Sequence, residues 1–416
     1  MMIFNPTEKG LAVAFFSTII LTACGGGGDS DNNSNNSNPP ATVKPIESTQ
    51  TLKPTKPATP SKPSNSDAIL PVGDAKVTIS SIDSKNYDQA ALVGSNLISL
   101  QRQDCGLGGV EYDQELTEIA TQHAQYIQHV FSNTTPTTFN AHYENEIADI
   151  KNSTGKNNPF FRGVSFKDRL LRANYPDLAY GVTENIAQTA YFNSAGKVIS
   201  PEYASYSMTK SLLAAPYHQR ILMTPNLSQT GSGMVAYKPY NKASDKSQSY
   251  VFVNASSATQ STKNDSVKGL FTYPCAGVTD TNTALYNEFP SPVAGTGRNL
   301  KYDPIGQPVY ISMPSANSIK VSNIKFYDVQ RKVDVSTDLL DFNNDPHKNT
   351  AYELPKNEAF ILPLTDSLKS CKTGRKQGQN CGLYGNSEYK VSFDVLVDNQ
   401  TLNTKKFTFR TGNVNY

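Results

Sequence analysis

Residues 183–187 read Thr-Glu-Asn-Ile-Ala, and residues 216–222 read Pro-Tyr-His-Gln-Arg-Ile-Leu. Glu184 lies among Val, Ile and Ala, an unusual context for a carboxylate unless it has partners. His218 is in a turn flanked by polar residues, and so is His142, one of only five His in the chain. Two imidazoles and a carboxylate can ligate zinc or form an acid–base cluster. Each of the three follows or precedes an expected helix or strand end, where loops gather, so we expect these side chains to converge.

Helical patterns surround these stretches. Apolar residues at spacings of three and four predict two amphipathic helices, the second with Asp113 as its N-cap. The pair Ser165 and Asp168 reads as a capping box, and Ser200-Pro201 places a capping residue before a proline at the first helical position. We expect Pro216 to end the helix that begins there. The four helices are expected at 86–100, 113–130, 166–173 and 201–215. Strand-like runs at 233–237 and 250–254 predict a hairpin after them.

The block from residue 80 to residue 275 resembles the CAP superfamily, the domain of cysteine-rich secretory proteins, antigen 5 and plant pathogenesis-related proteins of group 1. Its motifs appear in the family's order over about 160 residues. They are Gly106-Leu107, Val110-Glu-Tyr-Asp113, Leu116-x-x-Ile119-Ala120-x-x-His123-Ala124, Ala141-His142-Tyr143-Glu144, Thr183-Glu184-Asn185-Ile186-Ala187, residues 216–222 and Gly231-Ser-Gly233. The resemblance implies an α+β fold, a three-layer α-β-α sandwich around an antiparallel sheet.

The resemblance also implies a surface cavity with two histidines and two acids, for which His142, His218 and Glu184 match three positions. The second acid departs from the family pattern, because Glu202 lies far upstream of His218 while Ser211 and Leu212 hold the nearer positions. Glu144 is a possible substitute. Two interpretations stay open: a site for a divalent cation such as zinc on His142, Glu184 and His218, or a hydrogen-bonded cluster that supports the loops.

The remaining residues give little support to catalysis. His123 lies on the apolar face of its helix and is expected to pack in the core. Arg169 and Arg220 pair either with cavity acids or with surface acids. The chain contains no G-x-S-x-G elbow, H-E-x-x-H motif, P-loop or EF-hand loop. We therefore favour a binding module for a lipid, glycan or protein ligand. The alternatives are a hydrolase that uses Glu184 with His142 or His218, and an architectural protein of the cell envelope.

The first 23 residues read as an export signal. The apolar run Leu11–Leu21 is too short to span a bilayer as a helix, which needs about 20 residues. It leads into Leu21-Thr-Ala-Cys24, which resembles a bacterial lipobox, whose cysteine is acylated and becomes the mature N-terminus. The resemblance implies sorting to the outer membrane, because Gly25 follows the cysteine. Residues 24–70 are rich in Gly, Asn, Ser, Pro and Lys, and we expect a disordered tether there.

The four other cysteines predict two disulfides in an exported chain. Cys371 and Cys381 enclose a short polar loop, so local pairing is expected, and Cys105 with Cys275 follows by elimination. A zinc site would need tighter spacing such as C-x-x-C, which these cysteines lack.

The last part of the chain, residues 285–416, is expected to form an all-β, immunoglobulin-like sandwich. Short runs with alternating apolar residues recur there, and residues 389–395 alternate cleanly. They lie at 308–313, 318–329, 332–337, 359–364, 389–398 and 406–411. Across all 416 residues, 38 Lys and Arg balance 36 Asp and Glu for a net charge of +2. This balance gives no basic footprint for nucleic acid.

Overall fold

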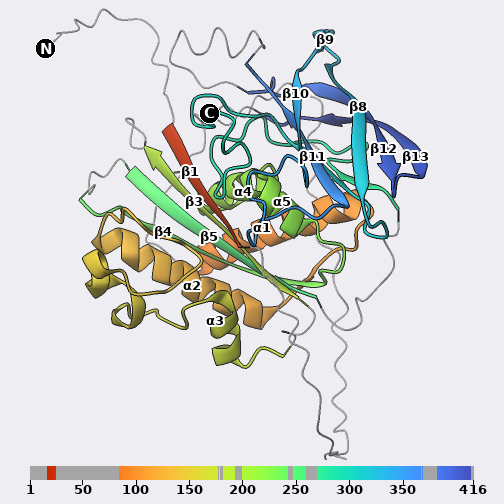
Figure 1. Ribbon diagram of the computed structural model, residues 1–416. Helices are drawn as coiled ribbons and strands as arrows, with labels where there is room; N and C mark the ends of the chain where they lie inside the picture. The colour runs from red at the N-terminus through yellow and green to blue at the C-terminus, as the bar shows by residue number, and fades with distance from the viewer. Residues whose placement is uncertain are drawn as a thin grey trace, which may run out of the picture.

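A computed structural model describes residues 16–24, 84–176, 178, 181–192, 199–241, 247–258, 269–366, 368 and 382–413 (Figure 1). Most of the predicted tether and the predicted Cys371–Cys381 bridge lie outside these residues. None of the helices in the described ranges combines the length and the hydropathy that a membrane span requires.

The helices form where local signals place them. Asp113 Oδ1 accepts a hydrogen bond of 2.7 Å from the Leu116 backbone N–H, and Ser165 and Asp168 form the predicted capping box. The fourth helix ends at Leu212 rather than 215. Pro216 does not end that helix but occupies the first turn of a new one, where its missing N–H costs nothing. The α-helices are α1 (Ser84–Asp104), α2 (Gln114–Asn133), α3 (Phe166–Ala173), α4 (Pro201–Leu212) and α5 (Pro216–Leu222); two 3₁₀ helices, η1 (Ala148–Ser153) and η2 (Gly155–Asn157), lie between α2 and α3.

A five-stranded sheet lies between two helical layers, in the order β1-β3-β5-β4-β2. Its pairs are antiparallel except for the parallel pair β2–β4, and the hairpin predicted from the sequence is β4–β5. The bounds are β1 (Phe16–Cys24), β2 (Glu111–Tyr112), β3 (Val182–Phe192), β4 (Gln229–Tyr237) and β5 (Ser247–Ser257).

Alternation along the strands divides the core between the two faces of this sheet. Phe252 and Met234 pack with α1, α4 and α5, whereas Val251 and Val235 pack with α2 and α3. Figure 1 shows α2 and α3 on one side and α4 and α5 on the other. At Gly233, an added Cβ would lie only 2.3 Å from the Thr121 backbone nitrogen, so the glycine lets α2 pack directly on β4. The structure is thus an α-β-α sandwich at this end of the chain.

Strand β1 comes from the segment that the sequence predicts as the end of the export signal. It pairs antiparallel with β3 at the sheet's outer edge, and Cys24 lies opposite Glu184 in the register. Cleavage before Cys24 would remove β1 apart from that residue and would leave β3 as the edge strand.

Two four-stranded sheets, β10-β11-β7-β6 and β13-β12-β8-β9, form the C-terminal part and share one apolar core. The predicted runs at 308–313, 318–329, 359–364 and 389–398 are strands, while the run at 332–337 is divided between two short strands, and the last strand begins at Thr401. The bounds are β6 (Phe271–Tyr273), β7 (Val309–Ser312), β8 (Ile319–Asp328), β9 (Val333–Asp334), β10 (Thr337–Asp341), β11 (Glu358–Pro363), β12 (Glu388–Val397) and β13 (Thr401–Arg410).

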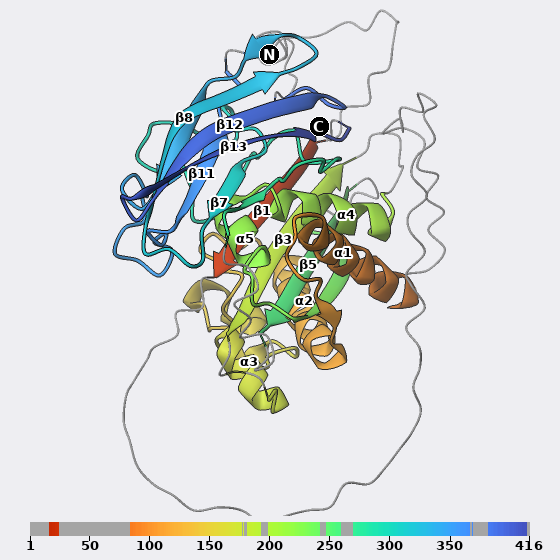
Figure 2. The same cartoon turned by 90° about the vertical axis from the view of Figure 1, so that its right-hand side faces the viewer.

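The two parts of the chain meet at the α1, α4 and α5 layer. Figures 1 and 2 show the C-terminal sheets on this side, away from α2 and α3. Phe360 and Tyr310 from the C-terminal part belong to the same buried cluster as Phe252 of the first sheet. The predicted Cys105–Cys275 disulfide is confirmed, with a Cα–Cα distance of 5.4 Å, and it ties the end of α1 to the segment after β6. The layer of α2 and α3 therefore stays uncovered by the C-terminal part.

Candidate functional site

His142 and Glu184 meet under the α2 and α3 layer. His142 belongs to the loop after α2, and Glu184 lies near the start of β3. The His142 Nδ1 atom is 2.9 Å from Glu184 Oε2, and the two side chains are 2% and 1% exposed. The convergence predicted for these two residues, 42 positions apart, is present in the structure.

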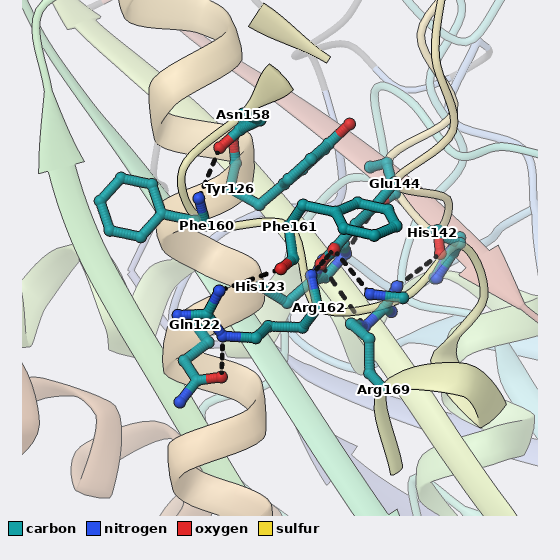
Figure 3. Close-up of polar contacts among 12 residues, drawn as sticks. Gln122, His123, Tyr126, His142, Glu144, Asn158, Phe160, Phe161, Arg162 and Arg169 are labelled. Carbon is teal, nitrogen blue, oxygen red and sulfur yellow. Dashed lines mark hydrogen bonds and ion pairs between the residues drawn. The ribbon is translucent and has the colours of Figure 1, made fainter. Parts of the chain in front are cut away.

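Arg169 of α3 fixes both residues. Its Nη2 donates to Glu184 Oε1 at 2.6 Å. Its Nη1 donates to the His142 carbonyl oxygen at 3.2 Å, and Figure 3 shows Arg169 beside His142. Burial alone would raise the pKa of Glu184, but the charges of Arg169, His123 and His142 outweigh it and lower that pKa to about 2. Glu184 is therefore a carboxylate held by a buried cation, which also decides that Arg169 pairs inside the cluster and not at the surface.

His123 and Glu144 form the other half of the cluster. The His123 Nδ1 atom is 2.8 Å from Glu144 Oε1, and its Nε2 atom is 2.7 Å from the Ala141 carbonyl oxygen. Glu144 Oε2 accepts two backbone N–H groups, from Arg162 at 2.6 Å and Gly163 at 3.2 Å. His123 is fully buried, as its place on the apolar face predicted, but it is a member of the polar cluster and not an isolated core residue.

His218 has a different partner. It lies on α5, and its Nδ1 atom is 3.0 Å from Oε1 of Glu288, a residue of the segment between β6 and β7. The same oxygen accepts the backbone N–H groups of Tyr217 and His218. Burial raises the pKa of Glu288, and the interaction with His218 offsets part of that rise. The described contacts thus join His142 to Glu184 and join His218 to Glu288.

The sequence did not identify Glu288 as a partner of His218, it predicted His123 as a packed core residue outside the cluster, and it left Arg169 between cavity acids and surface acids. Glu288 lies 70 residues after His218, in a segment without helical or strand periodicity, so no local signal pairs the two. For His123, the spacing of three residues to Ala120 and four to Ile127 indicates burial, and burial of an imidazole was the available signal for a polar partner.

The cluster does not fit a divalent cation while Arg169 is in place. Both oxygens of Glu184 already accept hydrogen bonds, from His142 and Arg169, and both oxygens of Glu144 are used as well. In the described part of the chain, no three His, Cys, Asp or Glu side chains are arranged to hold a metal ion.

A pocket of about 310 Å³ opens beside the cluster, between α2 and α3. One face of α2 and one face of α3 form its walls, because the lining residues on each helix follow at spacings of three and four. The lining residues are Glu115, Glu118, Ile119, Gln122, Arg162, Arg169, Arg172 and Ala173. Arg169 therefore links the pocket to the buried carboxylates beneath it.

The described contacts of the cluster contain no nucleophile. The hydrogen bonds found for Glu144, Glu184, His123 and Arg169 run to one another, to His142 and to backbone groups, and none of them involves a Ser, Thr or Cys side chain. What the arrangement can do is hold the α2–α3 loop and Arg169 rigidly at the floor of the pocket.

No model of a known protein family matches the chain, and no curated protein matches it. Among solved structures, the chain is similar to an extracellular protein containing an SCP domain from Bacillus anthracis. The two chains are 15% identical with a TM-score of 0.24, and the match covers 42% of this chain and 44% of that one.

Proposed function

We propose that this protein is an exported binding module of the CAP type, anchored to the bacterial outer membrane by a lipid on Cys24. The ordered motif series from Gly106 to Gly233 supports the family assignment, and the layers of helices on both faces of an antiparallel sheet agree with it. The C-terminal part, whose relation to immunoglobulin-like domains stays a prediction, closes the opposite face of the sandwich.

One observation carries the choice of binding over catalysis: the carboxylate oxygens of Glu144 and Glu184 are all occupied by contacts within the buried cluster. Arg169 and His142 hold Glu184 as a carboxylate with a pKa of about 2, and a base this weak accepts a proton poorly near neutral pH. The hydrolase alternative assigns the role of base to Glu184 with His142 or His218. In the described contacts, however, the His218 ring pairs with Glu288 and not with Glu184. A hydrolase therefore has less support than a binding module.

The proposed ligand site is the pocket between α2 and α3. It has the size of a small-molecule site, which usually begins at about 300 Å³. Its floor is rigid, because Arg169 is fixed by the carboxylate and the carbonyl beneath it. Rigid donors bind with less loss of conformational entropy than flexible surface side chains do.

The test compares the native, full-length protein with two tryptophan variants on the same helix. Ala173 lines the pocket, so Ala173→Trp fills it, whereas Leu171 is exposed and not part of the lining, so Leu171→Trp is the matched control. We expect mass spectrometry of extracts to find a bound molecule in the wild type and in Leu171→Trp and to lose it in Ala173→Trp.

Three outcomes would count against this proposal. Absence of any bound molecule in all three proteins would favour the architectural alternative. A molecule retained in Ala173→Trp would place the site elsewhere. Hydrolysis of a peptide library that disappears in a folded His142→Asn variant would favour the hydrolase.

A further inference from the structure

The outer edge of the first sheet is occupied by β1 in this structure. β1 pairs antiparallel with β3 over nine residues, from Phe16 opposite Phe192 to Cys24 opposite Glu184. Figures 1 and 2 show β1 beside β3 at the end of the sheet. It also lies against α4 and α5, and α5 in turn contacts β3. The edge of β3 therefore forms a slot, beside these helices, that accepts one extended chain.

The backbone groups of β3 that face this slot belong to alternate residues. The Ala258 N–H donates to the Gly181 carbonyl oxygen, so the Gly181 carbonyl faces the chain that continues from β5. The register between β3 and β5 runs without a shift, and successive residues of a strand direct their N–H and C=O groups to opposite sides. The backbone groups of Ile186, Gln188 and Ala190 therefore face β1.

Removal of residues 1–23 would open the slot. The mature chain would then present the N–H and C=O groups of Ile186, Gln188 and Ala190 without their partners in β1. β3 spans eleven residues, and an unpaired edge of this length is a template for another strand. Main-chain hydrogen bonds to such an edge supply affinity for extended peptides, and side-chain pockets supply specificity.

Asn185 gives the slot a polar preference. Its side chain is fully buried, and neither its Nδ2 nor its Oδ1 atom has a hydrogen bond to a described residue. In the register Asn185 lies opposite Ala23, and directly opposite residues of an antiparallel pair share one face of the sheet. Alanine has no side-chain donor or acceptor. A chain with a carboxamide at this position would satisfy both atoms, because a carboxamide donates and accepts.

A single extended chain fits this slot better than a second copy of the protein does. Antiparallel pairing of two β3 edges needs a two-fold axis normal to the sheet, which brings the same helical layer of both copies to one side. Because α5 contacts both β1 and β3, it overhangs the slot. The α5 helices of two copies would therefore occupy the same space.

We propose that the mature protein binds an extended peptide segment on the β3 edge, antiparallel to β3 in place of β1, with an Asn side chain opposite Asn185. The inference rests on one part of the proposed function, the removal of residues 1–23 that leaves acylated Cys24 at the N-terminus. It goes beyond that function, because it adds a second ligand site separate from the pocket between α2 and α3.

Fluorescence anisotropy tests the inference on the full-length mature lipoprotein in detergent, after mass spectrometry has shown whether residues 1–23 are absent. The probe is a labelled peptide of residues 16–24 with Ala23→Asn, Cys24→Ser and two added lysines at each end for solubility. We expect it to bind the mature protein but not the Cys24→Ala precursor, whose own β1 fills the slot. Ala173→Trp, which fills the separate pocket, should bind the probe as the wild type does.

Methylation of backbone nitrogens separates strand addition from nonspecific apolar binding. Ile20 lies opposite Gln188, so the Ile20 N–H faces β3, whereas the Leu21 N–H points away from it. A methyl group on the Ile20 nitrogen removes a donor and enters the ladder, so we expect the probe to bind at least about tenfold more weakly. A methyl group on the Leu21 nitrogen is the matched control and should change the affinity little.

A second comparison tests the contact with Asn185. The probe with the native Ala23 should bind the wild type about tenfold more weakly than the Asn probe does, because it leaves the Asn185 amide unpaired. In Asn185→Ala, the advantage of the Asn probe should disappear, since its carboxamide has lost its partner.

Failure of this inference differs from failure of the proposed function. If the wild-type chain keeps residues 1–23, the slot stays filled, and the lipid anchor and this inference are both wrong. If residues 1–23 are absent and the probe does not bind, only this inference is wrong. Equal losses on methylation of Ile20 and Leu21 would overturn strand addition, and so would equal binding to the mature protein and the Cys24→Ala precursor. Equal binding of the Asn and Ala probes would overturn the role of Asn185.

Discussion

The His123 Nδ1 atom lies 2.8 Å from Glu144 Oε1, and neither side chain is exposed to solvent. The other ring nitrogen of His123 faces the Ala141 carbonyl oxygen at 2.7 Å, and a carbonyl only accepts hydrogen bonds. Nε2 must therefore have the hydrogen, and a further proton is shared between Nδ1 and Glu144. Because Glu144 Oε2 accepts two backbone N–H groups, the ion pair of imidazolium and carboxylate is the favoured form.

This pair predicts a large loss of stability when one partner is removed. His123→Leu leaves the Glu144 carboxylate buried without its cation, and such a change typically costs about 3–5 kcal/mol in the free energy of unfolding. His129→Leu is the matched control on α2, because His129 is only partly buried and bonds to Asn133 at the helix end. Urea unfolding of both variants measures the difference.

The double variant His123→Leu with Glu144→Gln should recover part of that loss, because no uncompensated charge remains. If His123→Leu destabilises the protein no more than His129→Leu, then His123 is an ordinary core residue and the shared proton is not a stabilising feature.

A second prediction concerns acid. The pKa of Glu184 is about 2 in the folded protein against an ordinary value of 4.5. The folded state therefore favours the ionised carboxylate more than the unfolded state does. The stabilisation from Glu184 is therefore complete above pH 4.5 and is lost as the pH falls through about 2. Unfolding free energies measured from pH 6 to pH 2 should decrease less steeply in Glu184→Gln than in the wild type. Glu146→Gln, an exposed neighbour of the cluster, should follow the wild-type slope.

Local signals in the sequence predicted the parts of this fold that depend on neighbouring residues. Asp113 and Ser165 cap α2 and α3 as expected, since a cap depends on residues within three positions. The pairing of His142 with Glu184 followed from the odd position of a carboxylate in an apolar strand. The partner of His218 could not be predicted, because Glu288 reaches it only through the packing of the C-terminal part on α5.

The metal interpretation of the cluster leads to a third prediction. Arg169 and His142 already occupy the two oxygens of Glu184, so a divalent cation would have to displace an arginine from a buried ion pair. We expect the unfolding temperature to stay the same after treatment with EDTA and after addition of zinc at neutral pH. If zinc raises the unfolding temperature and His142→Ala abolishes this rise, the metal site predicted from the sequence would be supported.

The Cys105–Cys275 bridge gives a fourth prediction. The bridge closes a loop across a sequence separation of 170 residues, and in the chain-entropy model its removal costs on the order of 5 kcal/mol. Replacing both cysteines by Ser should lower the free energy of unfolding by several kcal/mol without changing the native circular dichroism spectrum. A loss below about 1 kcal/mol would show that the packing of α1 against the C-terminal part suffices without the bridge.

The last prediction concerns Cys24 and the edge of the sheet. If Cys24 is acylated and becomes the N-terminus, the mature protein lacks β1, and the β3 amides that face β1 lose their partners. Cys24→Ala should remove the lipid mass and keep residues 1–23 attached. Hydrogen exchange should then be faster for these β3 amides in the mature wild type than in Cys24→Ala, while amides paired between β4 and β5 exchange equally in both. If the wild type has the lipid but its β3 amides exchange as fast as those of Cys24→Ala, then β1 does not pair with β3 in the precursor. If the wild type has no lipid, the lipobox prediction itself is wrong.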